Sequence, residues 1–332
     1  MNKKARIIEL DYLKGIGIFL VVLGHTILLQ NALSTKYVIL ARFIYSFHMP
    51  LFFIASGIIS GLQRNLQCNI VKTAKKLLIP YFFWSFVYII LFAIKNKVSL
   101  LERVYATITC RGIAPLWFLA TLFVTKIFLS EYEKRIENFI TSKVKRQILL
   151  ILICLVLALA LKVLVKNIQS PIICYPIISV ARVFLATIFE SMGYLIGLNW
   201  KSICQYKKAF FMISGLCFFI VQSITQNTVN MHTYTFDSLV IFIITGLTGT
   251  LFLLETCLML PRNIKVLSEI GKSSMDIMIL HYPPMPILKG CIIVGTLLKN
   301  DVVIVLITIM ALFITFEIHK LFLEPIRKRY LL

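Results

Sequence analysis

Two ionisable residues, Lys14 and His25, lie eleven positions apart in the first long apolar stretch of the sequence. An α-helix turns by about 100° per residue, so eleven residues bring the second side chain to within about 20° of the first. At about 1.5 Å of rise per residue, the two lie roughly 16 Å apart along the helix axis. Such a pair could bind an anion at one depth and transfer a proton at another. The alternatives are a lysine that reaches the interface and a histidine hydrogen-bonded to a neighbouring helix.

Two further histidines lie next to prolines in apolar stretches. His48 is followed by Met49-Pro50, and His281 by Tyr282-Pro283-Pro284-Met285-Pro286. Proline strains the preceding helical turn and removes a backbone donor, so we expect a kink at Pro50 and irregular backbone after His281. Irregular backbone at membrane depth is tolerated only within protein or around a cavity. The pattern predicts a polar cavity beside both histidines, although His48 could equally be structural and His281 could mark a helix end nearer the outer surface.

The composition places these residues in a membrane. Of the 332 residues, 59% are hydrophobic and 15% are charged, and the mean hydropathy is +0.89, whereas soluble domains are about a quarter charged. A bilayer-spanning helix needs roughly 20 mostly apolar residues. The sequence therefore predicts an all-α, polytopic integral membrane protein with one domain over 1–332. The ten predicted helices cover 13–33, 43–62, 77–94, 113–130, 147–165, 172–198, 208–222, 236–260, 275–297 and 302–324.

Lysine and arginine are distributed unevenly between the predicted loops. If the N-terminus is cytoplasmic, the segments on that side hold 21 of the 35 Lys and Arg residues, and the segments on the other side hold 8. Cytoplasmic loops carry such an excess, so both termini are predicted to be cytoplasmic. The net charge of +21 therefore reflects membrane orientation, and no nucleic-acid partner is predicted. The first stretch carries Asp11, Lys14 and His25 and is expected to be retained, not cleaved as a signal peptide.

Four more residues are candidates for a substrate site because ionisable groups in hydrocarbon usually face a protein interior or a wet cavity. Arg182 and Glu190 lie eight residues apart, about 80° around the same helix, so each is expected to have another partner. Arg111 and Trp117 lie at the outer mouth of the fourth predicted helix, where both residue types also occur without any function. We predict that these four residues and His281 bind substrate.

Three lysines, Lys72, Lys75 and Lys76, precede the third predicted helix. They could hold the phosphate groups of a substrate, and positive charge on the cytoplasmic side explains them equally well. The eight cysteines show no paired metal-ligand spacing, and most lie in apolar stretches. We interpret them as packing thiols and predict no metal site.

Five blocks of the sequence resemble one known family. Lys14 and His25, with ten residues between them, resemble the first-helix signature of the acyltransferase family 3 membrane proteins, which is Arg or Lys, ten residues, then His. The resemblance extends over nearly the whole chain, and the sugar-acetylating branch, which includes fucose O-acetylase-like proteins, is nearest. The other blocks, in the order of the family, are Phe47-His48-Met49-Pro50-Leu51-Phe52-Phe53 through Ser56-Gly57, Leu78-Ile79-Pro80-Tyr81, Leu116-Trp117-Phe118-Leu119, and Gly271-Lys272-Ser273-Ser274 with Leu280-His281.

The resemblance implies a multi-pass O-acyltransferase of the bacterial cytoplasmic membrane. Such a protein moves an acyl group, generally acetyl, from cytoplasmic acetyl-CoA to a hydroxyl of a cell-envelope glycan or lipid-linked saccharide. Two departures from the family pattern bear on the donor site. Lys14 stands where many relatives have Arg, which keeps the charge and loses the bidentate fork. The family's pair of arginines before the third helix is matched only by Lys72 with Lys75, or by Lys76 in a shifted alignment, so a coenzyme A clamp there rests on charge alone.

His25, Lys14 and His48 form the predicted catalytic set. His25 would deprotonate the acceptor hydroxyl or transiently carry the acyl group, and the sequence leaves both routes open. Lys14 and the three lysines would hold the donor phosphates. A transporter or flippase for a glycan precursor or an anionic substrate would also place ionisable residues and broken helices at mid-membrane, and a structural membrane subunit is a third alternative.

Overall fold

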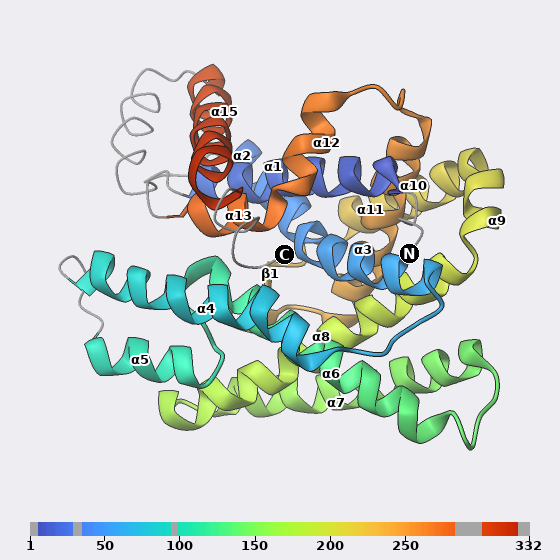
Figure 1. Ribbon diagram of the computed structural model, residues 1–332, viewed down its shortest axis with the longest axis horizontal. Helices are drawn as coiled ribbons and strands as arrows, with labels where there is room; N and C mark the ends of the chain where they lie inside the picture. The colour runs from blue at the N-terminus through green and yellow to red at the C-terminus, as the bar shows by residue number, and fades with distance from the viewer. Residues whose placement is uncertain (1–5, 29–34, 94–98, 283–300, 325–332) are drawn as a thin grey trace.

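The computed structural model describes residues 6–28, 35–93, 99–282 and 301–324, and these residues are mostly helical (Figure 1). The first half of the chain contains α1 (Ile8–Leu28), α2 (Thr35–Tyr45), α3 (His48–Leu62), α4 (Ile70–Ala93), α5 (Leu100–Ile108), the 3-10 turn η1 (Ala114–Leu116), α6 (Trp117–Ile136) and α7 (Lys143–Asn167). The second half contains α8 (Pro171–Leu198), α9 (Trp200–Gln205), α10 (Lys207–Ile224), α11 (Leu239–Met259), α12 (Lys265–Lys272), α13 (Ser274–Leu280), α15 (Asp301–Ile318) and the π-helical turn η2 (His319–Leu323). The strands of the described chain, β1 (Val229–Asn230) and β2 (Thr235–Phe236), form an antiparallel hairpin between α10 and α11.

The predicted all-α polytopic membrane fold is confirmed. Within the described ranges, eight helical segments are long and apolar enough to cross a membrane, and they correspond to the first eight predicted helices. The boundaries differ by several residues, because capping residues and not hydropathy decide where a helix begins. The third predicted helix, for example, begins at Ile70 and not at residue 77, since the Asn69 side chain accepts a hydrogen bond from the Lys72 amide at 2.9 Å. Most of the ninth predicted helix, 275–297, lies outside the described residues, and the tenth corresponds to α15 with η2.

The second predicted helix is interrupted in the turn before Pro50, as the proline predicts. Regular helix ends at Tyr45 and resumes at His48, so the break falls at Ser46 and Phe47. The reason is that a proline ring clashes with the carbonyl four residues earlier, here that of Ser46, while its missing N–H is not needed in a first helical turn. The freed Ser46 carbonyl accepts a hydrogen bond from the Thr245 hydroxyl at 3.4 Å. The break therefore lies directly before His48.

Helices α3 and α8 cross at four glycines, two on each helix at a spacing of four residues. A Cβ atom on Gly57 would lie 2.0 Å from the Glu190 carbonyl oxygen, and one on Gly193 would lie 2.1 Å from the Ile54 carbonyl oxygen. Gly61 and Gly197 repeat the arrangement one turn further along. Small residues at this spacing let membrane helices approach until their backbones touch. The crossing fixes α3, and with it His48, against the centre of the bundle.

The other histidine-bearing helix, α1, is held in the same way against α12. A Cβ atom on Gly271 would lie 1.8 Å from the Asp11 carbonyl oxygen, and one on Gly15 would lie 2.6 Å from the Leu267 carbonyl oxygen. Neither side of this contact leaves room for a side chain. Gly271 belongs to one of the sequence blocks noted above, and in the structure it allows α12 to pack closely on α1.

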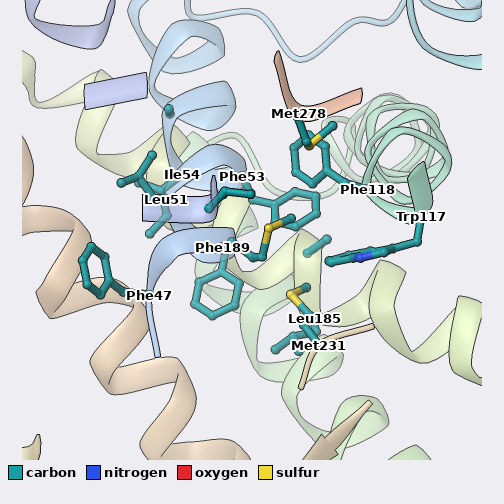
Figure 2. Packing of buried hydrophobic residues seen from close by; sticks show 14 of the residues in the cluster. Phe47, Leu51, Phe53, Ile54, Trp117, Phe118, Leu185, Phe189, Met231 and Met278 are labelled. Carbon is teal, nitrogen blue, oxygen red and sulfur yellow. The ribbon is translucent and has the colours of Figure 1, made fainter. Parts of the chain in front are cut away.

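The hydrophobic core joins α3, α6 and α8 to the hairpin and α13 (Figure 2). Phe53 of α3 packs on Phe118 of α6, with ring centroids 4.8 Å apart. Met231 of the hairpin and Met278 of α13 reach the same cluster (Figure 2). The core thus connects the elements around the start of α3, which carries His48, and the end of α13, which His281 follows.

The glycine crossing predicts a position-specific loss of stability. Gly193→Ala would press a methyl group into the backbone of α3, and overpacking of this kind costs roughly 1–3 kcal/mol or more. Gly215→Ala is the matched control, because a Cβ atom there meets only the Phe252 ring, which can turn aside. We expect the thermal unfolding midpoint in detergent, followed by size-exclusion fluorescence, to fall for Gly193→Ala and to change little for Gly215→Ala. Equal midpoints for the two variants would contradict the crossing.

Candidate functional site

A cavity of about 330 Å³, here called the histidine cavity, lies between α1, the α2–α3 break, the loop before α6 and the hairpin. Val21, His25 and Leu28 line it from one face of α1, as their spacing on a helix requires. The aromatic and imidazole side chains in its wall are His25, Tyr45, His48, Trp117, His232 and Tyr282. The expected cavity is therefore present beside His48, and the neighbours of His281, Met278 and Tyr282, line it while His281 itself does not.

His25 is hydrogen-bonded to His281 within this wall. The distance from Nδ1 of His25 to Nε2 of His281 is 2.7 Å. The two rings are inclined by only 11°, with centroids 5.0 Å apart. The distance between the centroids exceeds the distance between the two nitrogens by about two ring radii. The rings therefore lie edge to edge in nearly one plane, as a hydrogen bond between them requires. In the part of the chain that the structure describes, Nε2 of His25 has no hydrogen-bond partner.

His48 and His281 each direct Nδ1 at a backbone carbonyl of the preceding turn. The Nδ1 of His48 lies 2.8 Å from the Ile44 carbonyl oxygen, and that of His281 lies 3.1 Å from the Ile277 carbonyl oxygen. A carbonyl oxygen can only accept, so the proton of a neutral His48 is on Nδ1 and its Nε2 is an acceptor. His48 can therefore receive a proton or accept a hydrogen bond in the cavity.

A second cavity, here called the Lys14 cavity, has a volume of about 600 Å³ and lies at the other end of α1. Its charged residues are Arg6, Asp11 and Lys14, and Gln63 lines it from the end of α3. Asp11 accepts from Arg6 at 2.6 Å and 3.1 Å and pairs with Lys14 at 3.1 Å. Two cations thus share one carboxylate, which leaves the group with a net positive charge that can attract an anion.

The three lysines predicted to bind the donor lie elsewhere on the surface. Lys72, Lys75 and Lys76 are exposed along the first turns of α4, and they are not among the residues that line the Lys14 cavity. The structure brings Lys14 and Arg6 together, and it does not bring the three lysines to that pair.

Arg182 is fully buried behind Trp117 and does not line the histidine cavity. Its guanidinium lies 5.0 Å from the centre of the Trp117 ring and donates to the carbonyls of Cys110 and Arg111 at 2.9 Å and 3.0 Å. These carbonyls belong to a loop with left-handed backbone at Cys110 (φ 58°) and Gly112 (φ 76°). Arg182 therefore stabilises the turn that leads into the cavity wall.

Arg111 and Glu190 also lie outside the cavity wall. The Arg111 guanidinium packs 4.2 Å from the centre of the Tyr175 ring. Glu190 is fully buried, forms an ion pair with Lys126 and accepts from the Ser56 hydroxyl at 3.1 Å. The expectation that Arg182 and Glu190 have separate partners is confirmed. Of the predicted substrate-binding residues, only Trp117 lines the histidine cavity, and His281 lies directly behind His25.

Several residues of the cavity wall were not predicted from the sequence, among them Tyr45, Asn230, His232 and Tyr282. His232 is partly buried, stacks on Trp117 with ring centroids 6.3 Å apart, and points Nε2 at the Gly112 carbonyl oxygen at 3.3 Å. Burial, and then the nearby Arg182 and Arg111 charges, lower the pKa of His232 to about 3. The hairpin that carries it is a short polar loop between two apolar helices, where hydrophobic periodicity is uninformative.

These features define a polytopic α-helical membrane protein with an imidazole-lined cavity at one end of its first helix and a cationic cavity at the other. A family model described as an acyltransferase domain matches residues 7–319. The chain belongs to acyltransferase family 3.

Two curated relatives share parts of the sequence. The chain is 28% identical over 131 residues to the nodulation protein NolL of Mesorhizobium japonicum, which covers 37% of this chain and 35% of the relative. It is 42% identical over 85 residues to the nodulation protein NolL of Sinorhizobium fredii, covering 24% of this chain and 23% of the relative. The matched segments thus span about a third or less of each relative's length. No solved structure matches the chain.

The low pKa of His232 predicts how one residue contributes to the pH dependence of stability. An unfolded histidine binds a proton near pH 6.5, and folded His232 does so only near pH 3, so this contribution is complete above pH 6.5 and is lost as the pH falls toward 3. Between pH 7 and pH 5 the loss is about 2 kcal/mol, at 1.36 kcal/mol per pKa unit. We expect His232→Gln, which keeps a donor for Gly112, to show a smaller drop in unfolding midpoint over this pH range than the parent protein. A parallel drop in both proteins would contradict the assignment.

Proposed function

We propose that this protein transfers an acyl group, most simply acetyl, from acyl-CoA at the cytoplasmic face to a hydroxyl of a cell-envelope glycan or its lipid-linked precursor. The observation that carries this proposal is the position of His25. Its Nε2 has no protein partner in the described chain and its ring lines a cavity, while Lys14 on the same face of the same helix lines the cationic cavity at the opposite end. A donor and an acceptor could therefore approach α1 from different sides.

His25 supplies the proton transfer that the reaction needs. Its Nε2 takes the proton of the acceptor hydroxyl as the oxygen attacks the thioester carbonyl. The carbon–sulfur bond then breaks, and the departing coenzyme A thiolate takes the proton back from Nε2. In the covalent alternative, Nε2 attacks the thioester carbonyl first and coenzyme A leaves as the thiolate. The hydroxyl oxygen then takes the acyl group from Nε2, the bond between Nε2 and the acyl carbon breaks, and the hydroxyl proton neutralises the thiolate. Both routes need Nε2 unprotonated at the start and directed into the cavity.

The remaining cavity wall suits a saccharide hydroxyl. Nε2 of His48 is an acceptor and can hold the hydroxyl hydrogen in place before transfer. Tyr45 and Asn230 bring a hydroxyl and an amide that can donate hydrogen bonds. Aromatic walls with a few fixed polar groups are typical of small-molecule sites.

The Lys14 cavity is the proposed binding site for the donor phosphates. Lys14 and Arg6 share Asp11 as their counter-ion, so a phosphate would meet one uncompensated positive charge. The roughly 16 Å along α1 between Lys14 and His25 would then be spanned by the thioester arm of the donor. Lys72, Lys75 and Lys76 lie on α4, away from this cavity, and would act only through longer-range positive charge.

Replacement of His25 tests the catalytic role. We expect His25→Ala to lower coenzyme A release and acetyl transfer by about 10²–10⁴-fold, the usual contribution of general base catalysis. The assay uses the purified protein in liposomes with labelled acetyl-CoA and a panel of methyl glycosides as acceptors. His319→Gln is the control, because His319 lies outside the histidine cavity and Gln can still donate to Asp276. Full transfer by His25→Ala at equal membrane abundance would refute the assignment.

The same assay separates the enzyme from a carrier. Acetyl-CoA-dependent modification of a glycoside with one coenzyme A released per acetyl group supports the acyltransferase reaction. Translocation of a saccharide without coenzyme A release would support a transporter or flippase instead. Mass spectrometry of the envelope polysaccharide from cells with and without the protein then identifies the modified hydroxyl.

Lys14 provides a separate test of donor binding. Lys14→Met keeps most of the unbranched apolar side chain and removes its charge, and a hydrogen bond to a charged group contributes roughly 1.5–3 kcal/mol. We expect the KM for acetyl-CoA to rise by about tenfold or more, with a smaller effect as salt concentration increases. Lys14→Arg, which preserves the charge, should leave KM close to that of the parent protein. An unchanged KM in Lys14→Met would remove Lys14 from the donor site.

A further inference from the structure

His25 and His281 are 256 residues apart in the sequence and form the closest histidine pair in the described chain. His281 is fully buried, so the lining of the histidine cavity includes its neighbours Met278 and Tyr282 and does not include His281 itself. A residue that is shielded from the cavity does not bind substrate directly. Its influence on the cavity is exerted through the hydrogen bond to His25.

The hydrogen bonds of His281 determine where the protons lie. Its Nδ1 is 3.1 Å from the Ile277 carbonyl oxygen, which can only accept, so Nδ1 carries the proton. The charged form of a fully buried ring lacks the solvation that would compensate for burial, so His281 is neutral and its Nε2 is an acceptor. The bond of 2.7 Å between the two rings must then be donated by Nδ1 of His25. Neutral His25 consequently has a bare Nε2.

Among the described residues, the groups that contact the His25 ring or act on it electrostatically are aromatic rings and other imidazoles. Tyr45 of α2 and Tyr282 after α13 contact the His25 ring, with ring centroids 6.4 Å and 6.0 Å away. His48, His232 and His281 are the titratable groups that act on His25 electrostatically. Among the described residues no carboxylate is paired with either ring. The second nitrogen of a catalytic histidine is commonly fixed by a carboxylate or a backbone carbonyl, and here a second histidine holds that position.

We propose that His281 is a positioning residue that fixes His25 in the Nδ1–H tautomer and turns its bare Nε2 into the histidine cavity. The catalytic consequence of this inference rests on the proposed function, whereas the hydrogen bond and the tautomer of His25 do not depend on it. The backbone carbonyl of Ile277 sets the tautomer of His281, and His281 passes that choice to His25. With the opposite tautomer, Nε2 of His25 would carry the proton and could not accept one from a hydroxyl.

Two substitutions of His281 separate positioning from folding. Gln is long enough to place its amide oxygen near the position of Nε2, so His281→Gln keeps an acceptor for His25, while His281→Leu fills the space with none. We expect His281→Leu to lower kcat for acetyl-CoA-dependent coenzyme A release by about 10–100-fold, as loss of an orienting partner does, with KM for acetyl-CoA within about twofold. His281→Gln should restore most of kcat. If His281 had a purely structural role, His281→Leu would instead lower the amount of folded protein, and the folded fraction would keep the kcat of the parent protein.

A spectroscopic measurement reads the tautomer directly. The full-length protein in liposomes, labelled with ¹⁵N-histidine, is compared with the His25→Ala protein so that the two His25 nitrogens are assigned by difference. We expect Nδ1 of His25 to be protonated and Nε2 to be bare in the parent protein, and protonation of Nε2 to become populated in His281→Leu. This result does not depend on turnover, and the comparison of the parent protein with His25→Ala remains informative if His281→Leu does not fold.

The outcomes distinguish this inference from the function on which its catalytic part rests. A bare Nδ1 on His25 in the parent protein, or an unchanged kcat in His281→Leu while His25→Ala is inactive, would overturn the positioning role and leave the proposed acyltransferase mechanism standing. Full activity of His25→Ala would refute the proposed mechanism, and the ¹⁵N spectrum would still decide the tautomer.

Discussion

The site depends on one constraint, which is that backbone polar groups in a membrane must be satisfied within the protein. Where α2 breaks and where α13 ends, the carbonyls of Ile44 and Ile277 accept from the Nδ1 atoms of His48 and His281. Each of these carbonyls also accepts a backbone N–H, from Phe47 and from His281 respectively, so the imidazole is a second donor to it and is left with Nε2 as an acceptor. Since His281 in turn receives a hydrogen bond from His25, the irregular backbone decides the protonation pattern of all three rings.

Close backbone contact keeps these helix ends in place. Glycines at the α3–α8 crossing hold the helix that begins with His48, and Gly271 brings α12 onto α1 beside Asp11. The second contact lies at the end of α1 that carries the cationic cavity, so it also fixes the carboxylate that Lys14 and Arg6 share. Packing that has no room for a Cβ atom cannot shift by fractions of an ångström without separating the backbones. The two cavities are therefore built on rigid helical contacts, although irregular segments form part of the walls of one.

Sequence reasoning succeeded where a property repeats along a helix and failed where distant segments meet. Hydropathy predicted the eight membrane-crossing segments, and helical spacing placed Lys14 and His25 on one face of α1, each in a cavity wall. The proline rule predicted an interruption beside His48, and the break lies in the turn before Pro50, where the ring would clash with the Ser46 carbonyl. Nothing local reveals that Arg182 holds the carbonyls of a left-handed loop, or that His281 lies against a ring 256 residues away. Those contacts arise only from tertiary packing.

The eleven-residue separation of Lys14 and His25 acquires a physical meaning from the two cavities. A separation of ten or twelve residues would turn one side chain away from the other by about 80° or 120° around α1, whereas it would change their distance along the axis by only about 1.5 Å. Such a change would barely alter the depth of either side chain in the membrane, but the two side chains would no longer lie on the same face of α1. Because α3 lies along this face and contributes to both cavities, the angle decides whether a molecule held at Lys14 extends along the α1–α3 contact toward His25. The spacing is therefore a constraint on direction more than on distance.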